Sequence, residues 1–286
     1  MGSAMDIIWY PSDLINAKVP ELPLGAYFRA AEVVTMRGAW NDRKAWFVGF
    51  KAGDNEANHS NLDIGSYVLD AFGRRFIMDL GADDYNMPGY FSTGANGPRW
   101  NYYRMRAEGH NLVILNPGLK PDQDPTASAK ISKFSNKGKT TFAIADLTPA
   151  YATQATKYIR GIAMADGKSV VLQDEVKTAK PSQLYWFAHT RAQVKVGANG
   201  KNAIMTLDSA QIEVVLVSPA KAQFTVMDAV PLASSPKSDV QNKNEGIRKL
   251  TIALDKVTDE KIVVEFRQVG KKNPAASVFY KQLNDW

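Results

Sequence analysis

The chain has 286 residues, of which 45% are hydrophobic, 22% charged and 10% aromatic, so it is long enough for one large or two ordinary domains. It contains no cysteine, which excludes a disulfide framework and thiolate chemistry. No stretch approaches the roughly 18 consecutive apolar residues of a membrane-spanning helix, so we expect no membrane span.

Lysine and arginine outnumber aspartate and glutamate by 35 to 29, and the resulting charge of +6 favours anionic ligands by long-range attraction. Acidic glycans and nucleic acids both fit this charge. The basic residues are spread along the chain, without an arginine-rich helix, zinc-finger spacing or an aromatic RNA-binding motif. We therefore expect no nucleic-acid partner, and a merely soluble basic surface is the simplest alternative.

The first residues, Met1–Met5, are interpreted as a cloning remnant, because they have neither the basic nor the apolar region of a signal peptide. Two short segments could be helical. They are Pro11–Ile15 and Ala150–Thr156, the second with a proline near its first position. Neither is long enough to organise a fold.

From residue 45 onward, short apolar runs rich in Val, Ile, Phe and Tyr alternate with Gly, Asn, Asp or Pro, which is the pattern of β-strands. The predicted strands are Ala45–Phe50, Ser66–Phe72, Arg75–Asp79, Asn111–Leu115, Ala129–Ser135, Thr140–Asp146, Tyr158–Ala163, Ser169–Glu175, Leu184–Thr190, Gln193–Val196, Ala203–Leu207, Gln211–Val217, Gln223–Asp228, Arg248–Leu254 and Lys261–Gln268.

Two dipeptides between predicted strands, Asp166-Gly167 and Asn199-Gly200, supply the positive φ that tight hairpins require. The polar segment Ser234–Gly246 lacks periodicity and is predicted to be a loop. Together these patterns predict an all-β protein, a large antiparallel multi-sheet β-sandwich with few short helices.

Two of the three histidines lie at strand entrances. His59 precedes the strand that begins at Ser66, and His110 follows a glycine before the run Leu112–Leu115. Either could serve a site, and either could be an ordinary loop or edge residue. His189 follows an apolar run and is predicted to be a hydrogen-bonded core histidine.

Asp79 ends an apolar strand, where a partly buried carboxylate costs free energy unless it is paired or bound to a metal. One Asp with two His is a ligand set that zinc accepts. The alternative is an Asp-rich turn in which Asp79 caps backbone amides.

Several stretches, in this order, are similar to the C-terminal domain of the heparinase II/III family. They span Leu22 to Asp228 and are Arg37-Gly38-Ala39-Trp40, Gly49–Gly53, His59–Ser66, Asp79-Leu80-Gly81, Asp84-Tyr85, Tyr102-Tyr103-Arg104, Gly109-His110-Asn111, Asp146–Tyr151, Arg160-Gly161, Gln173-Asp174-Glu175 and Trp186–Thr190.

The resemblance implies a β-sandwich that packs against an N-terminal α/α toroid, with substrate in the cleft between them. We expect this toroid to be missing from the chain. Residues 6–21 then resemble the connector that follows it, residues 22–232 the sandwich, and residues 233–286 a loop with closing strands of the same domain or of a small accessory β-domain.

The reaction that the resemblance implies is β-elimination at a uronic acid, which makes the intact protein a polysaccharide lyase. His59 aligns with the family histidine that points into the cleft and is expected to be the base or the carboxylate partner. Because the toroid supplies the other catalytic groups, we expect the chain alone to be inactive. A glycan-binding module without chemistry and a domain that braces the toroid are the alternatives.

The resemblance also implies a metal site. Asp79 and His110 match two family ligands, but Asn61 stands where many relatives have a histidine. An amide oxygen suits calcium better than zinc, so either one divalent ion or a metal-free, hydrogen-bonded version of the site is expected.

Four further side chains are candidates to face the substrate, since aromatic rings stack on sugars and Arg binds carboxylate or sulfate. They are Arg99, Tyr102, Tyr103 and Arg104. Alternating Tyr and Arg is also what an ordinary exposed strand looks like. The implied partner is an acidic polysaccharide, heparan sulfate-like or alginate-like, and the implied location is the periplasm or the exterior of a bacterial cell.

Overall fold

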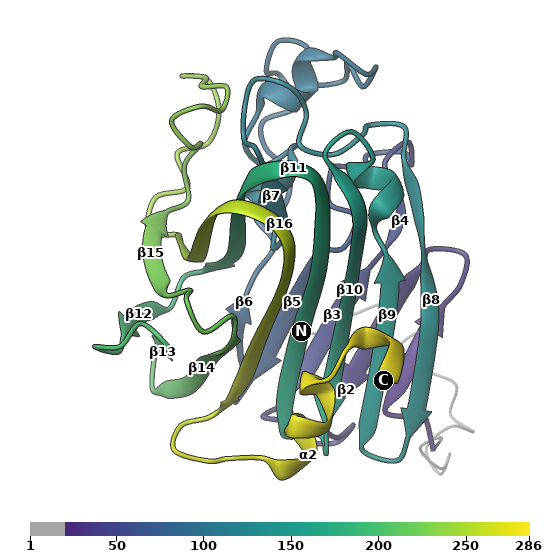
Figure 1. Ribbon diagram of the computed structural model, residues 1–286, viewed down its shortest axis with the longest axis vertical. Coiled ribbons are helices and arrows are strands. Elements are labelled where there is room, and N and C mark those ends of the chain that lie inside the picture. The colour runs from purple at the N-terminus through teal and green to yellow at the C-terminus, as the bar shows by residue number, and fades with distance from the viewer. Residues whose placement is uncertain (1–20) are drawn as a thin grey trace, which may run out of the picture.

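The computed structural model describes residues 21–286, whose strands form two antiparallel sheets. The smaller sheet has the order β1-β2-β3-β5-β6 and lies behind the larger one in Figure 1. Its strands are β1 (Gly25–Phe28), β2 (Val33–Arg37), β3 (Phe47–Lys51), β5 (Tyr67–Ala71) and β6 (Arg74–Ile77). The predicted sandwich of antiparallel sheets is therefore confirmed.

The larger sheet follows the path β12-β13-β14-β16-β11-β10-β9-β8-β4, with β15 paired to β16 and β7 paired to β11. Its strands are β4 (Gly53–Asp54), β7 (Val113–Leu115), β8 (Ser128–Lys137), β9 (Thr140–Asp146), β10 (Ala155–Ala165), β11 (Ser169–Thr190), β12 (Gln193–Val196), β13 (Asn202–Leu207), β14 (Ala210–Ser218), β15 (Phe224–Asp228) and β16 (Arg248–Gln268). Both predicted hairpin tips lie where expected, between β10 and β11 and between β12 and β13.

The main core lies between the two sheets. In β2, β3 and β5 every second residue is buried, as a strand with one covered face requires. The inward residues include Val34, Val48 and Leu69, and they join Ile162 and Leu172 of the large sheet in one hydrophobic cluster. The alternate residues of these three strands point to the outer face of the small sheet and are half-buried.

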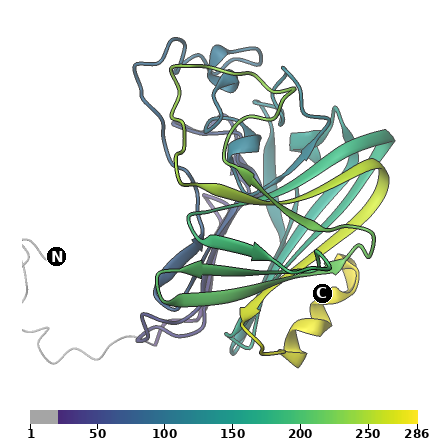
Figure 2. The ribbon, with the colours of Figure 1, turned by 90° about the vertical axis from the view of Figure 1, so that its left-hand side faces the viewer.

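The two longest strands, β11 and β16, pair with each other along almost their whole length. Each joins two segments that the sequence predicts as separate strands. Register shifts between Lys177 and Leu184 interrupt the pairing, and Figure 2 shows the two strands curving together toward the loops. The pairing of β16 with β11 and β14 makes it an interior strand of the sandwich.

Helical structure within residues 21–286 is limited to short turns. They are η2 (Pro98–Asn101), η3 (Ala107–Gly109), η4 (Thr148–Tyr151), α2 (Pro274–Ser277), η5 (Val278–Tyr280) and η6 (Leu283–Asp285). The predicted helix Ala150–Thr156 is wrong in its extent, because a single 3₁₀ turn ends at Tyr151 and β10 begins at Ala155. The predictions for Met1–Met5, Pro11–Ile15 and the connector 6–21 fall outside the described residues, apart from Glu21.

The C-terminal turns cover the outer face of the large sheet, where Phe279, Leu283 and Trp286 pack with Ala163 and Val171. The loops at the opposite end rest on a second apolar cluster built around Trp100, Tyr102 and Phe187. None of the helices in residues 21–286 has the length and apolar character to cross a membrane.

Candidate functional site

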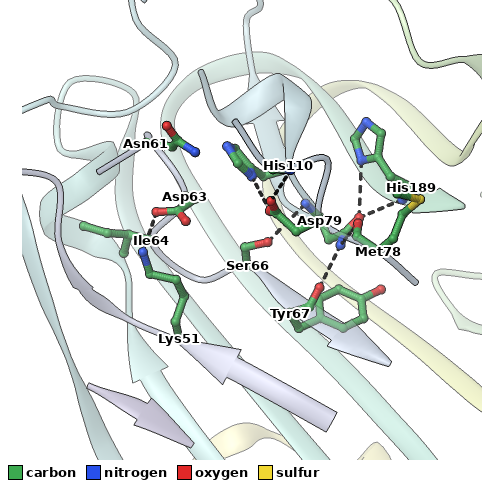
Figure 3. A network of polar contacts seen from close by, with 12 residues as sticks. Lys51, Asn61, Asp63, Ile64, Ser66, Tyr67, Met78, Asp79, His110 and His189 are labelled. Atoms are coloured by element: carbon green, nitrogen blue, oxygen red, sulfur yellow. Dashed lines mark hydrogen bonds and ion pairs between the residues drawn. The ribbon is translucent and has the colours of Figure 1, made fainter. Parts of the chain in front are cut away.

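Asp79 and His110 form a hydrogen-bonded pair at one end of the small sheet (Figure 3). Asp79 follows β6, and His110 lies between η3 and β7. The Nδ1 atom of His110 is 2.7 Å from Oδ2 of Asp79, whose Oδ1 accepts a hydrogen bond from the Gly81 amide at 2.8 Å. The sequence therefore identified two residues that the fold brings together over 31 positions.

The pKa shifts of both groups favour the charged form of the pair. Burial alone would lower the pKa of His110, but the Asp79 carboxylate outweighs burial and raises it. Burial would raise the pKa of Asp79, but His110 outweighs it and holds that pKa well below its usual range. Each group thus stabilises the charged form of the other.

His59 lies on the exposed loop between β4 and β5, with a left-handed backbone at φ 59°. Its ring is nearly parallel to that of Tyr85, with 6.4 Å between centroids and 18° between planes. Tyr85 in turn contacts Tyr90 and Phe91, at 5.0 and 5.5 Å between centroids. Tyr85 and Phe91 are 49% and 61% exposed, so an accessible imidazole lies beside accessible aromatic rings.

Buried arginines hold the loop that carries His59. Nη2 of Arg99 donates to the carbonyl of Ser60 at 2.8 Å and to Oδ1 of Asn61 at 3.0 Å. At the other end of the loop, Nη1 of Arg160 donates to the carbonyl of Gly65 at 2.8 Å. The backbone on both sides of His59 is therefore fixed, although His59 itself is exposed.

Arg160 also reaches the His110 turn, because Nη1 donates to the carbonyl of Asn111 at 2.6 Å. It is neutralised by Asp174 through two hydrogen bonds, from Nε at 2.6 Å and from Nη2 at 3.0 Å. Both side chains are fully buried. One ion pair in the core thus fixes the spacing of the His59 loop and the His110 turn.

The three predicted metal ligands are hydrogen-bonded to protein groups in this structure, and metal binding by them stays a prediction. His110 and Asp79 bond directly to each other, and Oδ1 of Asn61 is occupied by the guanidinium of Arg99, whose positive charge opposes a cation at that oxygen. Residues 21–286 contain no cluster of three or more His, Cys, Asp or Glu side chains suited to a metal. The Nε2 atom of His110 is buried and unpartnered, and it supplies one ligand where zinc needs three or four.

A further ion pair, between Lys51 and Asp63, lies near the Asp79–His110 pair. Nζ of Lys51, the last residue of β3, is 2.6 Å from Oδ1 of Asp63. Lys51, Asp63 and Asp79 line one hollow of about 240 Å³ on the outer face of the small sheet. Figure 3 shows the Lys51 and Asp63 side chains meeting to the left of the Asp79 pair. This end of the sheet therefore combines cationic and anionic groups at the surface.

The four predicted substrate-binding residues lie mostly inside the molecule. Arg99, Tyr102 and Tyr103 are 3%, 6% and 1% exposed, whereas Arg104 is half-buried. The Tyr102 hydroxyl donates to the carbonyl of Pro88 at 2.5 Å. Because Arg99, Tyr102 and Tyr103 are buried, their placement in this structure corrects the expectation that they face an open surface.

Arg104 holds a loop as well. Its Nε donates to Oδ1 of Asn244 at 2.8 Å, and its Nη1 donates to the carbonyl of Ala82 at 2.8 Å. Only part of its guanidinium remains for a ligand.

His189 is a core histidine, as the sequence predicts. It is fully buried, and its Nε2 lies 2.8 Å from the Tyr103 hydroxyl. Burial and the nearby charge of Lys249 lower the pKa of His189, so the ring is neutral. The backbone amide of His189 donates to Oδ1 of Asn111 at 2.7 Å, which ties this core to the His110 turn.

Sequence reasoning gave no site role to Tyr85, Lys51 or Arg160. Tyr85 and Arg160 lie in motifs that carry the family resemblance, which was the one available signal. Lys51 also lies in one of these motifs, Gly49–Gly53, but only the fold brings it to Asp63.

A family model described as Heparinase II/III-like, C-terminal, matches residues 16–276 of the chain. Among solved structures, a heparinase III gene product matches with a TM-score of 0.70 and 15% identity over 96% of this chain and 40% of its own. The heparan sulfate lyase HepC from Pedobacter heparinus matches with a TM-score of 0.70 and 15% identity over 94% of this chain and 40% of its own. No curated protein sequence matches significantly. The chain thus spans about two fifths of these structures, and at this identity they show the fold alone.

Proposed function

The chain belongs to the heparinase II/III-like C-terminal family, and on this premise we propose that it is the C-terminal domain of a polysaccharide lyase. The substrate class is a uronic-acid-containing glycan, heparan sulfate-like or alginate-like. We further propose that an N-terminal α/α toroid completes the cleft, and that the protein acts in the periplasm or outside the cell. The observation that carries the proposal is the exposed His59 imidazole, held on a braced loop beside exposed aromatic rings.

The proposed reaction breaks the C5–H and C4–O bonds of the uronic acid and forms a C4=C5 double bond. The C5 proton is weakly acidic, so charge that develops on the carboxylate must be stabilised by donors or cations. Either His59 takes the C5 proton and a positioned tyrosine donates a proton to the leaving C4 oxygen, or His59 binds the carboxylate and the tyrosine, as phenolate, takes the C5 proton and passes a proton to that oxygen. Tyr85, whose ring stacks on His59 and is half exposed, is the candidate from this chain.

The Asp79–His110 pair has a positioning role in this proposal. It connects the end of β6 to the turn before β7, and Arg160 connects that turn to the loop of His59. This network keeps the loop in one conformation before substrate binds, which effective catalysis requires. No metal ion is needed for that role.

The test measures the release of 4,5-unsaturated ends from a panel of uronate polymers by their ultraviolet absorbance. A protein that joins the toroid to this chain is compared with its His59→Ala and Tyr85→Phe variants and with the chain alone. We expect His59→Ala to lose activity, Tyr85→Phe to lose much of it, and the chain alone to be inactive.

Thermal unfolding of each variant is the control, and it should be unchanged because both side chains are exposed. Full activity of His59→Ala would remove this residue from the mechanism. Absence of product from every polymer, with glycan binding retained, would favour a non-catalytic glycan-binding module. A bracing domain predicts that His59 tolerates replacement and that glycan does not bind to this chain.

A further inference from the structure

A second hollow lies on the outer face of the small sheet, at the opposite end from Lys51. It measures about 330 Å³ and is lined by four arginines, two aspartates (Asp42 and Asp70), two tryptophans and Phe47 among others, so basic residues outnumber acidic ones. The arginines are Arg37, Arg43, Arg74 and Arg75. We propose that this arginine–tryptophan hollow binds a carboxylate or sulfate group of a linear acidic glycan, as a subsite remote from His59.

Two of the four arginine charges are already matched. Arg75 donates to both carboxylate oxygens of Asp70, at 2.6 and 3.0 Å, and Nε of Arg74 lies 2.6 Å from Asp208. Within residues 21–286, the guanidinium groups of Arg37 and Arg43 form neither an ion pair nor a hydrogen bond. Their donors are therefore available to an anion, and arginine binds carboxylate and sulfate in bidentate fashion.

Arg37 is held in place without being neutralised. Its guanidinium lies 3.8 Å from the centroid of the Trp40 ring and 5.1 Å from that of Phe47. The indole nitrogen of Trp40 donates to the carbonyl of Leu22 at 2.9 Å, which fixes the ring. Partial burial lowers the pKa of Arg37, so its charge is incompletely solvated and an added anion would stabilise it.

The hollow and the Lys51 end share one face of the sheet. Arg37 pairs with Phe47, Thr35 with Gly49, and Val33 with Lys51, in successive rows that point outward. Lys51 lies four positions after Phe47 along β3, which corresponds to about 13 Å. The row between them consists of Thr35, Gly49 and Val68, none of which carries a charge.

This layout favours a linear polymer with spaced anionic groups over a compact anion. It also disfavours nucleic acid, whose closely spaced phosphates need a continuous basic track with stacking rings. Trp40, which is 44% exposed, adds an aromatic surface suited to a sugar ring. The polymer class rests on the proposed function, whereas the anion site itself rests on the arginine and tryptophan geometry.

The experiment measures binding of a heparan sulfate chain to the 286-residue chain by isothermal titration calorimetry. We compare wild type with Arg37→Ala/Arg43→Ala, with Arg43→Ala alone, and with Arg191→Ala, an exposed arginine outside the hollow that matches the single change in charge. We expect the double variant to weaken binding by about tenfold or more, Arg43→Ala by several-fold, and Arg191→Ala by less than about twofold.

The same titration with alginate, which carries carboxylates, and with dextran sulfate separates carboxylate from sulfate recognition. Dextran is uncharged, so its binding would contradict the need for an anion. The proposal fails if Arg37→Ala/Arg43→Ala binds like Arg191→Ala, if no polymer binds to the wild type, or if a single-stranded DNA binds as tightly as the glycan. Because Arg43 is exposed, its single variant remains informative if the double variant does not fold. If Arg37→Ala/Arg43→Ala loses glycan binding but the longer protein has no lyase activity, this site is supported and the proposed reaction is rejected. If the longer protein is an active lyase but the double variant binds glycan like wild type, the reaction is supported and this site is rejected.

Discussion

The ion pair Arg160–Asp174 offers a test of how the core fixes the candidate site. Its closest N–O distance is 2.6 Å, and an exposed pair, Arg74–Asp208, has the same closest distance. Both carboxylates can be replaced by the isosteric amide, as Asp174→Asn and Asp208→Asn. The two pairs share contact distance and charge, whereas they differ in burial and in the number of hydrogen bonds that the carboxylate accepts.

The expected magnitudes differ widely. Asp174→Asn leaves the guanidinium of Arg160 buried without a counter-charge, and breaking a buried pair from one side costs about 3–5 kcal/mol. It also weakens the hydrogen bond that the Tyr158 hydroxyl donates to Asp174 at 2.9 Å. Asp208→Asn removes a contact that water already screens, at a cost of about 0–1 kcal/mol.

Urea unfolding, monitored by tryptophan fluorescence and circular dichroism, measures both changes in the free energy of unfolding. With a slope of about 3 kcal/mol/M, Asp174→Asn should lower the midpoint by roughly 1 to 2 M, and Asp208→Asn by no more than about 0.3 M. The reasoning is refuted if the two variants lose the same stability. It is also refuted if Asp174→Asn stays within about 1 kcal/mol of wild type.

Three further outcomes are expected. First, the pKa of His189 is lowered in the folded state, so at low pH the folded chain binds fewer protons than the unfolded chain. The free energy of unfolding should therefore fall as pH drops below about 6.5, by up to about 1.4 kcal/mol per pH unit. Urea unfolding from pH 5 to 8 should show this slope reduced in His189→Gln, and an unchanged slope would contradict the assignment. Second, Gly161→Ala should lose about 1–3 kcal/mol of stability, since the added Cβ would lie 2.3 Å from Leu283 and 2.8 Å from the Trp286 ring; wild-type stability on chemical denaturation would show that the C-terminal turns simply shift. Third, the addition of zinc, calcium or a chelator should leave the melting temperature unchanged. A metal ion that binds only the folded state would raise the melting temperature. A zinc-dependent rise would therefore show that the His110 site holds a metal.

The sequence predicted most strands because their ends are marked chemically. Thr140–Asp146 and Gln193–Val196 match β9 and β12 at both ends, and turn residues bound each of them. The breaks predicted within Ser169–Thr190 and Arg248–Gln268 were wrong. Polar residues interrupt the apolar pattern in the middle of β11 and β16. The backbone pairing between the two strands nevertheless continues through register shifts.

The missed strands have a physical reason as well. β1 and β2 are short, and their alternate residues face the half-exposed outer surface of the small sheet. In Val33-Val34-Thr35-Met36-Arg37 the alternation of buried Val34 and Met36 with half-buried neighbours becomes clear only once the strand is paired. Pairing with β3 supplies the stability that the local pattern does not indicate.

By itself, the sequence determined the fold class, the family and the residue types at the candidate site, including Asp79 and His110, because apolar alternation, turn residues and ordered motifs are local properties. Only the tertiary structure decided which polar atoms are left for a ligand. The carboxamide of Asn61 is taken by Arg99 across 38 positions, and Tyr103 lies against His189 in the core. Such pairings are set by how distant loops pack, and one local pattern of tyrosine and arginine is compatible with a buried turn and with an open surface.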